Sequence, residues 1–191
     1  LLALHWLTFY QSIKLANASV AATCMAIAPA VTALIEPSIT RTRFVTRNFV
    51  LGVLIVPGVL LVVGGIAAEM RAGFWLGVLS AGLIAVVSSL NKRYLNNEPV
   101  LAVTAIEVAA GALLLTVAMP VFAADGFAGL IPNRHDFLLL TVLAVGCTLL
   151  PFALSLLALR HLSAFTTQLA VNLEPVYTVL IAAVLLSEVQ E

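Results

Sequence analysis

Charged side chains are scarce in this 191-residue chain. Lysine and arginine together number 9, aspartate and glutamate also number 9, and the four types make up only 9% of the residues. Because a soluble domain carries about a quarter of its residues as charged side chains, the scarcity excludes an ordinary soluble protein. The formal net charge is zero, which argues against a nucleic-acid partner.

Cysteine is rarer still. Cys24 and Cys147 each lie within an apolar run, which predicts burial as small hydrophobic side chains rather than a disulfide bond or a metal site. His5 has no second histidine or cysteine at a suitable spacing, so we expect neither a bound metal nor a cofactor. The motifs HExxH and GxSxG and paired intramembrane aspartates are also missing, which weighs against a polytopic membrane enzyme.

Long apolar runs are what the chain does have. The run FVLGVLIVPGVLLVVGGIAA, at 49–68, holds twenty residues without a charged or polar side chain. As a helix it would be about 30 Å long, the thickness of the hydrocarbon core of a bilayer. Polar residues separate six further apolar segments, at 1–13, 18–35, 73–90, 100–124, 137–159 and 164–187. Since strand-like alternation is absent and the connections are short, we predict an all-α polytopic membrane protein, a transmembrane helix bundle without a soluble catalytic domain.

Basic residues predict how the bundle is oriented. The loops on one side carry six of them and the loops on the other side carry three, which favours placing the larger group in the cytoplasm. The larger group is Arg41, Arg43, Arg47, Lys92, Arg93 and Arg160, and the smaller group is Lys14, Arg71 and Arg134. The chain begins with Leu1 inside an apolar stretch, so we expect it to be a fragment of a longer protein.

An internal repeat relates the two ends of the chain. A shift of 146 residues places Lys14 on Arg160 and Pro29 on Pro175, so that each copy has a span, a basic residue, a tight turn and a second span with a proline. Five spans separate the copies, and an odd number turns the second copy upside down in the membrane. Inverted repeats are typical of transporters, whose sites lie near the midplane between the copies.

A family resemblance accompanies the repeat. The segment AVNLEPVYTVLIAAVLLSE, at 170–188, resembles the last repeat of EamA-type proteins of the drug/metabolite transporter superfamily, although Ser187 stands where that family usually has glycine. The segment LHWLTFYQSIKLANASVAATCMAIAPAVTALIEP, at 4–37, resembles the matching part of the first repeat. The resemblance implies ten helices in a 5+5 inverted repeat, of which this chain would hold helices three to nine. Residues 1–68 would be the end of the first repeat with three spans, and residues 73–191 most of the second with four.

Two carboxylates lie within the predicted spans. A charged group in the bilayer is costly unless it is paired, hydrated or protonated, so Glu107 and Glu174 are candidates for binding solute or carrying a coupling proton. The alternative is a hydrogen-bonded acid that braces a neighbouring helix, and for Glu174 the following Pro175 favours it. Gln168 and Asn172 share a face of the same span, where they could contact solute or make interhelical hydrogen bonds.

Polar aromatic residues mark the first span. His5 shares a face with Phe9 and Ser12, whereas Trp6 and Tyr10 lie on the next face. His5, Trp6 and Tyr10 would suit a pocket for an amphipathic organic solute, but an aromatic belt at the membrane surface would explain them equally well.

Small residues and prolines predict how the spans pack and bend. Alanines at four-residue spacing, from Ala18 to Ala30, predict close helix packing. Asn17 or Ser19 can cap the span that carries them. Kinks are expected at Pro29, Pro57, Pro151 and Pro175.

These features favour a secondary transporter of small organic solutes, with the lipid bilayer and a small molecule as partners and a proton as a candidate coupling ion. The resemblance implies export of metabolites or amino acids and the inner membrane of a bacterium. A polytopic membrane enzyme, a channel and a non-transporting scaffold stay open as alternatives, as do the substrate and the oligomeric state.

Overall fold

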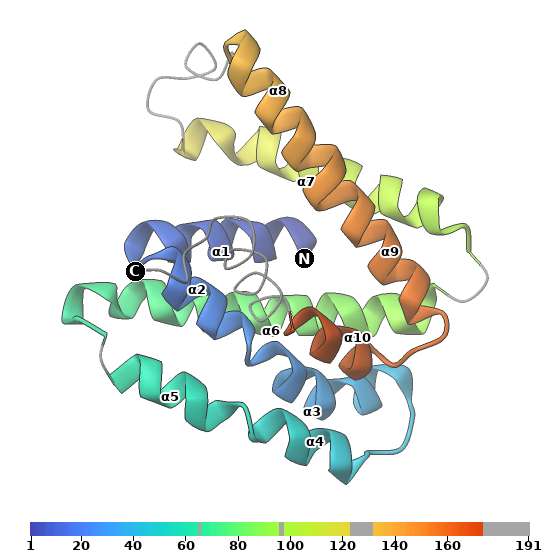
Figure 1. The fold of residues 1–191 in the computed structure, drawn as a ribbon. Helices are drawn as coiled ribbons and strands as arrows, with labels where there is room; N and C mark the ends of the chain where they lie inside the picture. Colours follow the sequence, from blue (N-terminus) through green and yellow to red (C-terminus); the bar gives the residue numbers. More distant parts are fainter. Residues whose placement is uncertain (65, 96–97, 123–131, 174–191) are drawn as a thin grey trace, which may run out of the picture.

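The computed structural model describes residues 1–64, 66–95, 98–122 and 132–173, and Glu174 and Pro175 lie outside this part of the chain. Within it the secondary structure is helical and contains no strand, which confirms the predicted all-α bundle (Figure 1). The helices are α1 (Leu2–Leu15), α2 (Ala18–Met25), α3 (Ala28–Thr40), α4 (Thr46–Val53), α5 (Val56–Gly64), α6 (Arg71–Tyr94), α7 (Val100–Phe122), α8 (Arg134–Val142), α9 (Leu150–Leu159) and α10 (Ala164–Val171). A 3-10 turn, Ala68–Met70, precedes α6, and a π-helix, Leu143–Leu149, joins α8 to α9.

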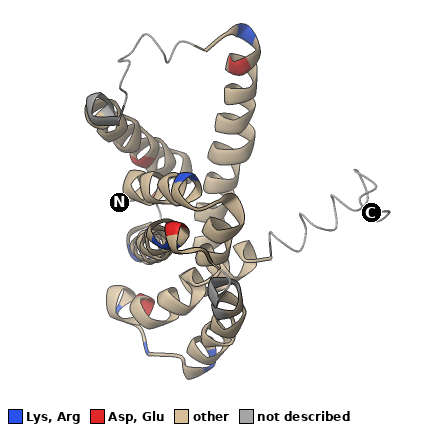
Figure 2. Cartoon of the chain, turned by 90° about the vertical axis from the view of Figure 1, so that its left-hand side faces the viewer, with Lys and Arg blue, Asp and Glu red and all other residues tan. Residues whose placement is uncertain are grey.

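Four helical stretches of the described residues are long and apolar enough to cross a membrane. They are Ala18–Thr40, Ala68–Tyr94, Val100–Ala118 and Arg134–Leu159, and each coincides with a predicted span. Two other predicted spans are not among them: α1 has only 14 residues, and the run at 49–68 is divided between α4 and α5. Figure 2 shows how few lysine, arginine, aspartate and glutamate positions interrupt these helices.

Prolines coincide with the breaks in the helices. The chain turns between α2 and α3 just before Pro29, and between α4 and α5 just before Pro57. The π-helix ends just before Pro151. Proline has no amide hydrogen and its ring clashes with the preceding turn, so it fits best in the first turn of a new helix, although Pro37 lies inside α3. The predicted interruptions at Pro29 and Pro57 are therefore confirmed, whereas at Pro151 the helix changes from π to α and continues. The predicted kink at Pro175 lies outside the described residues.

Helix α6 is the centre of the bundle. It packs against α1, α2 and α3, and its buried face consists largely of small residues. A Cβ atom added to Gly73 would lie 2.8 Å from the backbone nitrogen of Ala16, and one added to Gly77 would lie 2.8 Å from the Cβ of Cys24. These glycines let the neighbouring backbones approach α6 closely.

The alanine prediction for α2 is wrong in part. Ala18 and Ala22 are exposed and only Ala30 is fully buried, whereas Val20 and Cys24 face the bundle. The buried face of α2 is the one that fits the glycine side of α6, and a stripe of alanines in one helix does not reveal its partner. Cys24 is buried as predicted, but Cys147 lies exposed on the π-helix, contrary to the prediction, and both cysteines are free.

Local features of the helices recur after the 146-residue shift. The Asn17 side chain accepts a hydrogen bond from the Val20 amide at 2.8 Å, and the Ser163 side chain accepts one from the Thr166 amide at 3.1 Å. Both N-caps, and also the last residues of α2 and α10, are related by the same shift. Figure 1 shows that α1 and α9 run in opposite senses, and that α2 and α10 do so too.

The loops fall into two groups at opposite ends of the bundle. Figure 1 shows the α3–α4 and α9–α10 connections, the end of α6 and the start of α7 at one end of the bundle, and the α1–α2 connection with the starts of α6 and α8 at the other. The six basic residues predicted to lie together are at the first of these ends, in its connections or in the adjoining helix ends. We refer to this end as the basic end.

Candidate functional site

His5 joins α1 to the central helix α6. Its side chain is 8% exposed, and Nδ1 lies 3.0 Å from the backbone oxygen and 2.8 Å from the hydroxyl of Ser80. The Ser80 hydroxyl also donates to the backbone oxygen of His5 at 3.0 Å. The ring stacks on Phe9 with a centroid separation of 6.2 Å, which agrees with the shared face inferred from spacing. His5 therefore fixes the position of α1 on α6.

Gln168 and Asn172 both make hydrogen bonds between helices. Gln168 Nε2 donates to the Ser88 hydroxyl of α6 at 2.5 Å, and both side chains are buried. Asn172 Nδ2 donates at 2.9 Å to the backbone oxygen of Ala26, in the break between α2 and α3. Ala26 and Asn172 are 146 residues apart, so this bond joins equivalent positions of the two copies of the repeat. The sequence allowed either contact with solute or interhelical hydrogen bonds for these two residues, and the structure shows the interhelical hydrogen bonds.

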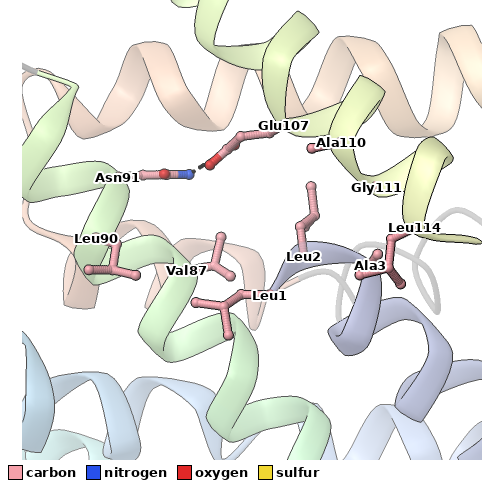
Figure 3. Close-up of a pocket in the computed structure, with 10 residues that line it drawn as sticks. All are labelled: Leu1, Leu2, Ala3, Val87, Leu90, Asn91, Glu107, Ala110, Gly111 and Leu114. Carbon is pink, nitrogen blue, oxygen red and sulfur yellow. Dashed lines mark hydrogen bonds between the residues drawn. The ribbon is translucent and has the colours of Figure 1, made fainter.

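Glu107 lines a cavity of about 300 Å³ between α1, α6 and α7. Asn91 Nδ2 of α6 donates to Glu107 Oε2 at 3.3 Å, and Figure 3 shows the two side chains pointing toward each other at the edge of the cavity. The other walls are apolar and are formed by Leu1, Leu2, Ala3, Val87, Leu90, Ala110, Gly111 and Leu114. A carboxylate and a carboxamide are therefore the polar side chains that a bound molecule would meet here.

Trp6 and Tyr10 line a second cavity, of about 400 Å³, between α1, α7 and the π-helix region. Half of its walls come from the π-helix: Leu143, Ala144, Thr148 and Leu149. The widened turn is marked by a hydrogen bond of 3.0 Å from the Thr148 hydroxyl to the backbone oxygen of Leu143, five residues back. The sequence did not predict the π-helix, since the segment is part of one continuous apolar span.

The two cavities flank the contact between α1 and α7. A Cβ atom added to Gly111 would lie 3.6 Å from the Cβ of Ala3 and 4.0 Å from the ring of Trp6. Glu107 lines one cavity and Val108, the next residue, lines the other. Of the seven candidate residues, Glu107, Trp6 and Tyr10 line cavities, His5, Gln168 and Asn172 join helices, and Glu174 lies outside the described residues.

Sequence reasoning missed the polar partners on α6. Ser80, Ser88 and Asn91 bond to three of the candidates, and together with Gly73 and Gly77 they lie on one face of the helix. That periodic run of small and polar residues was the available signal. Sequence reasoning also missed the role of Glu36, a buried residue of α3 whose carboxylate accepts from the backbone amides of Ala164 at 2.7 Å and Phe165 at 2.9 Å.

The described residues contain no group of three or more histidine, cysteine, aspartate or glutamate side chains placed to hold a metal ion. In comparisons with known proteins, residues 71–190 match the model of the EamA-like transporter family, which covers more than half of the chain. Neither the curated proteins nor the solved structures contain a match.

Proposed function

We propose a specific transport function from the premise that this chain belongs to the EamA-like transporter family. Membership makes it an integral membrane protein of a family that transports small solutes across the bilayer. Within that class, we propose a secondary transporter that exports small organic metabolites such as amino acids from a bacterium across the inner membrane. It works by alternating access and is not an enzyme.

Two inverted halves form the transporter in this proposal. Residues 1–68 end the first half and residues 73–191 make up most of the second. The equivalent N-caps at Asn17 and Ser163 support it, because the same local structure recurs after 146 residues. The bond between Asn172 and Ala26 gives further support, since equivalent positions meet where a two-fold axis relates two copies.

The observation that carries the proposal is the Glu107–Asn91 pair at the 300 Å³ cavity. A carboxylate within a membrane helix is costly, so a polar pair facing an otherwise apolar cavity is a candidate solute site. We propose that Glu107 binds the amino or other donor group of a solute and that Trp6 and Tyr10 contact its apolar part in the adjoining cavity. Gln168, Asn172 and His5 then position α10 and α1 around this site.

Proton coupling completes the proposal. Glu107 and Glu174 are the two intramembrane carboxylates that could exchange a proton for solute. Exchange requires the same group to be charged in one step and neutral in another, and the hydrogen bond from Asn91 to Glu107 is one that can be exchanged for a contact with solute.

The test is transport by the full-length protein in proteoliposomes, with counterflow of a radiolabelled amino acid or amine across a series of pH values. Glu107→Gln should lower the rate at least tenfold and flatten its dependence on pH, and Glu174→Gln should flatten the pH dependence. Glu98→Gln is the matched control, because Glu98 is exposed in the α6–α7 connection. If both intramembrane variants fold and keep the rate and pH profile of the unmodified protein, neither carboxylate carries a proton.

A further inference from the structure

Charged side chains bind the ends of helices at the basic end of the bundle. Lys92 Nζ donates to the backbone oxygen of Leu159 at 2.7 Å, and Arg93 Nη1 donates to that of Ile39 at 2.6 Å. Leu159 and Ile39 lie in the last turns of α9 and α3, whereas Arg160 donates to the backbone oxygen of Glu98 in the α6–α7 connection. The last carbonyls of a helix have no partner within it and carry partial negative charge, so cationic donors stabilise them.

The acidic counterpart is Glu36 at the start of α10. Its carboxylate accepts from the first two amides of that helix, those of Ala164 and Phe165, and the Ser163 side chain accepts from the third. The amides at the start of a helix have no partner within it, and a carboxylate there also interacts favourably with the helix dipole. Because the carboxylate is 8% exposed, little water is available to replace it.

Apolar packing closes the same end. Ala164, which begins α10, lies in a buried cluster with Leu95, Leu156 and Leu159. Val100, Val103 and Phe152 pack against the cluster. The amides that Glu36 binds therefore lie beside a dry contact between α6, α9 and α10.

These bonds differ in which parts of the chain they join. Those of Glu36 and Arg93 connect α3, in the first half, to α10 and α6, in the second. Those of Lys92 and Arg160 connect residues within the second half. If the halves move as rigid bodies, the first pair of contacts must break for the basic end to open, whereas the second pair can persist throughout.

We propose that Glu36 is a positioning residue for transport, which together with Arg93 forms a latch between the two halves at the basic end. This inference rests on the proposed function. The latch holds the basic end closed in one part of the transport cycle, and it must release once in every cycle.

The test measures opening directly in the full-length protein. Cys24→Ala and Cys147→Ser remove the native cysteines of this part of the chain, with any others replaced likewise. Thr167→Cys then places a thiol on α10 one turn inside the latch, at a side chain that is 6% exposed. A membrane-impermeant maleimide is added to the side that the basic end faces. Glu36→Gln and Arg93→Gln should each speed labelling about tenfold, which corresponds to about 1.4 kcal/mol.

Lys92→Met is the matched control, because it removes a charged hydrogen bond at the same end but within one half. It should leave the labelling rate unchanged. Glu36→Asp keeps the charge, so the thiol of Thr167→Cys should be labelled more slowly in this variant than in Glu36→Gln. In proteoliposomes, Glu36→Gln should change the maximal rate of transport and leave KM for solute unchanged.

The outcomes separate the latch from the proposed function. Faster labelling of the Glu36 and Arg93 variants supports the latch even if none of the proteins transports the solutes tested, a result that would count against the transport proposal alone. Unchanged labelling in folded Glu36→Gln or Arg93→Gln overturns the latch while transport stands. Equal acceleration by Lys92→Met also overturns it, since general loosening would then explain the effect. If Glu36→Gln fails to fold, Arg93→Gln decides the question.

Discussion

A close contact between α6 and α2 predicts a large effect from a single methyl group. In Gly77→Ala the new Cβ atom on α6 would lie 2.8 Å from both Cβ and Sγ of Cys24 and 3.0 Å from the hydroxyl oxygen of Ser12. Carbon atoms in contact prefer a separation of about 3.5–4.0 Å. Helices α1 and α2 would therefore have to move away from α6 by about 1 Å.

The magnitude follows from two opposing effects. Overpacking a tightly packed contact costs about 1–3 kcal/mol. Replacing glycine by alanine within a helix returns about 0.5–1 kcal/mol, because alanine loses less backbone entropy on folding. We therefore expect Gly77→Ala to lower the free energy of unfolding by about 1–2 kcal/mol, measured by denaturant titration in detergent micelles with tryptophan fluorescence as the signal.

Gly82→Ala on the same helix is the matched control. No atom lies within 4 Å of the Cβ that this substitution would add, so it should be neutral or should raise stability by up to about 1 kcal/mol. Adding Cys24→Gly to Gly77→Ala removes the two atoms at 2.8 Å, and the double variant should be more stable than Gly77→Ala alone. The reasoning is refuted if Gly77→Ala is as stable as Gly82→Ala.

Two further predictions concern the helix contacts and the topology. Ser80→Ala removes the hydrogen bonds of the Ser80 hydroxyl to His5. It should lower the free energy of unfolding by about 1–3 kcal/mol in the same titration. A loss below about 0.5 kcal/mol would show that the polar groups of His5 find other partners. In intact cells, Arg134→Cys should be labelled by an impermeant maleimide and Arg43→Cys only after the membrane is opened, and the reverse pattern would place the basic end outside.

Local features of this protein were predictable because they depend on neighbouring residues alone. A run of twenty apolar residues predicts helical backbone in lipid, since each backbone amide must find its partner within its own segment, although the run at 49–68 is divided between α4 and α5. Proline disfavours a continuous helix through its own ring and missing amide hydrogen, as at Pro29 and Pro57. Asn17 caps α2 through an amide three residues away. The sequence also grouped the basic residues at one end, because the spans alternate in direction.

The sequence identified several residues of the candidate site but not how they are arranged. Glu107, Trp6 and Tyr10 were identified from the cost of a charge in lipid and from helical spacing, but nothing in their spacing indicates Asn91 or the π-helix that completes the second cavity. For Gln168 and Asn172 the sequence allowed either contact with solute or hydrogen bonds between helices. Only the position of α10 beside α3 and α6 shows that both side chains make interhelical hydrogen bonds.

The amino-acid sequence by itself therefore determined the helices, their breaks, their caps and the ends at which the charges gather. The tertiary structure alone decided which faces meet. The gap left by Gly77 receives Cys24 of α2, and the alanine stripe consequently points outward in the first turns of α2. The same packing brings Glu36 to the start of α10, 128 residues away. A partner that distant is set by the shapes of several helices together, whereas a cap or a kink is set within one turn.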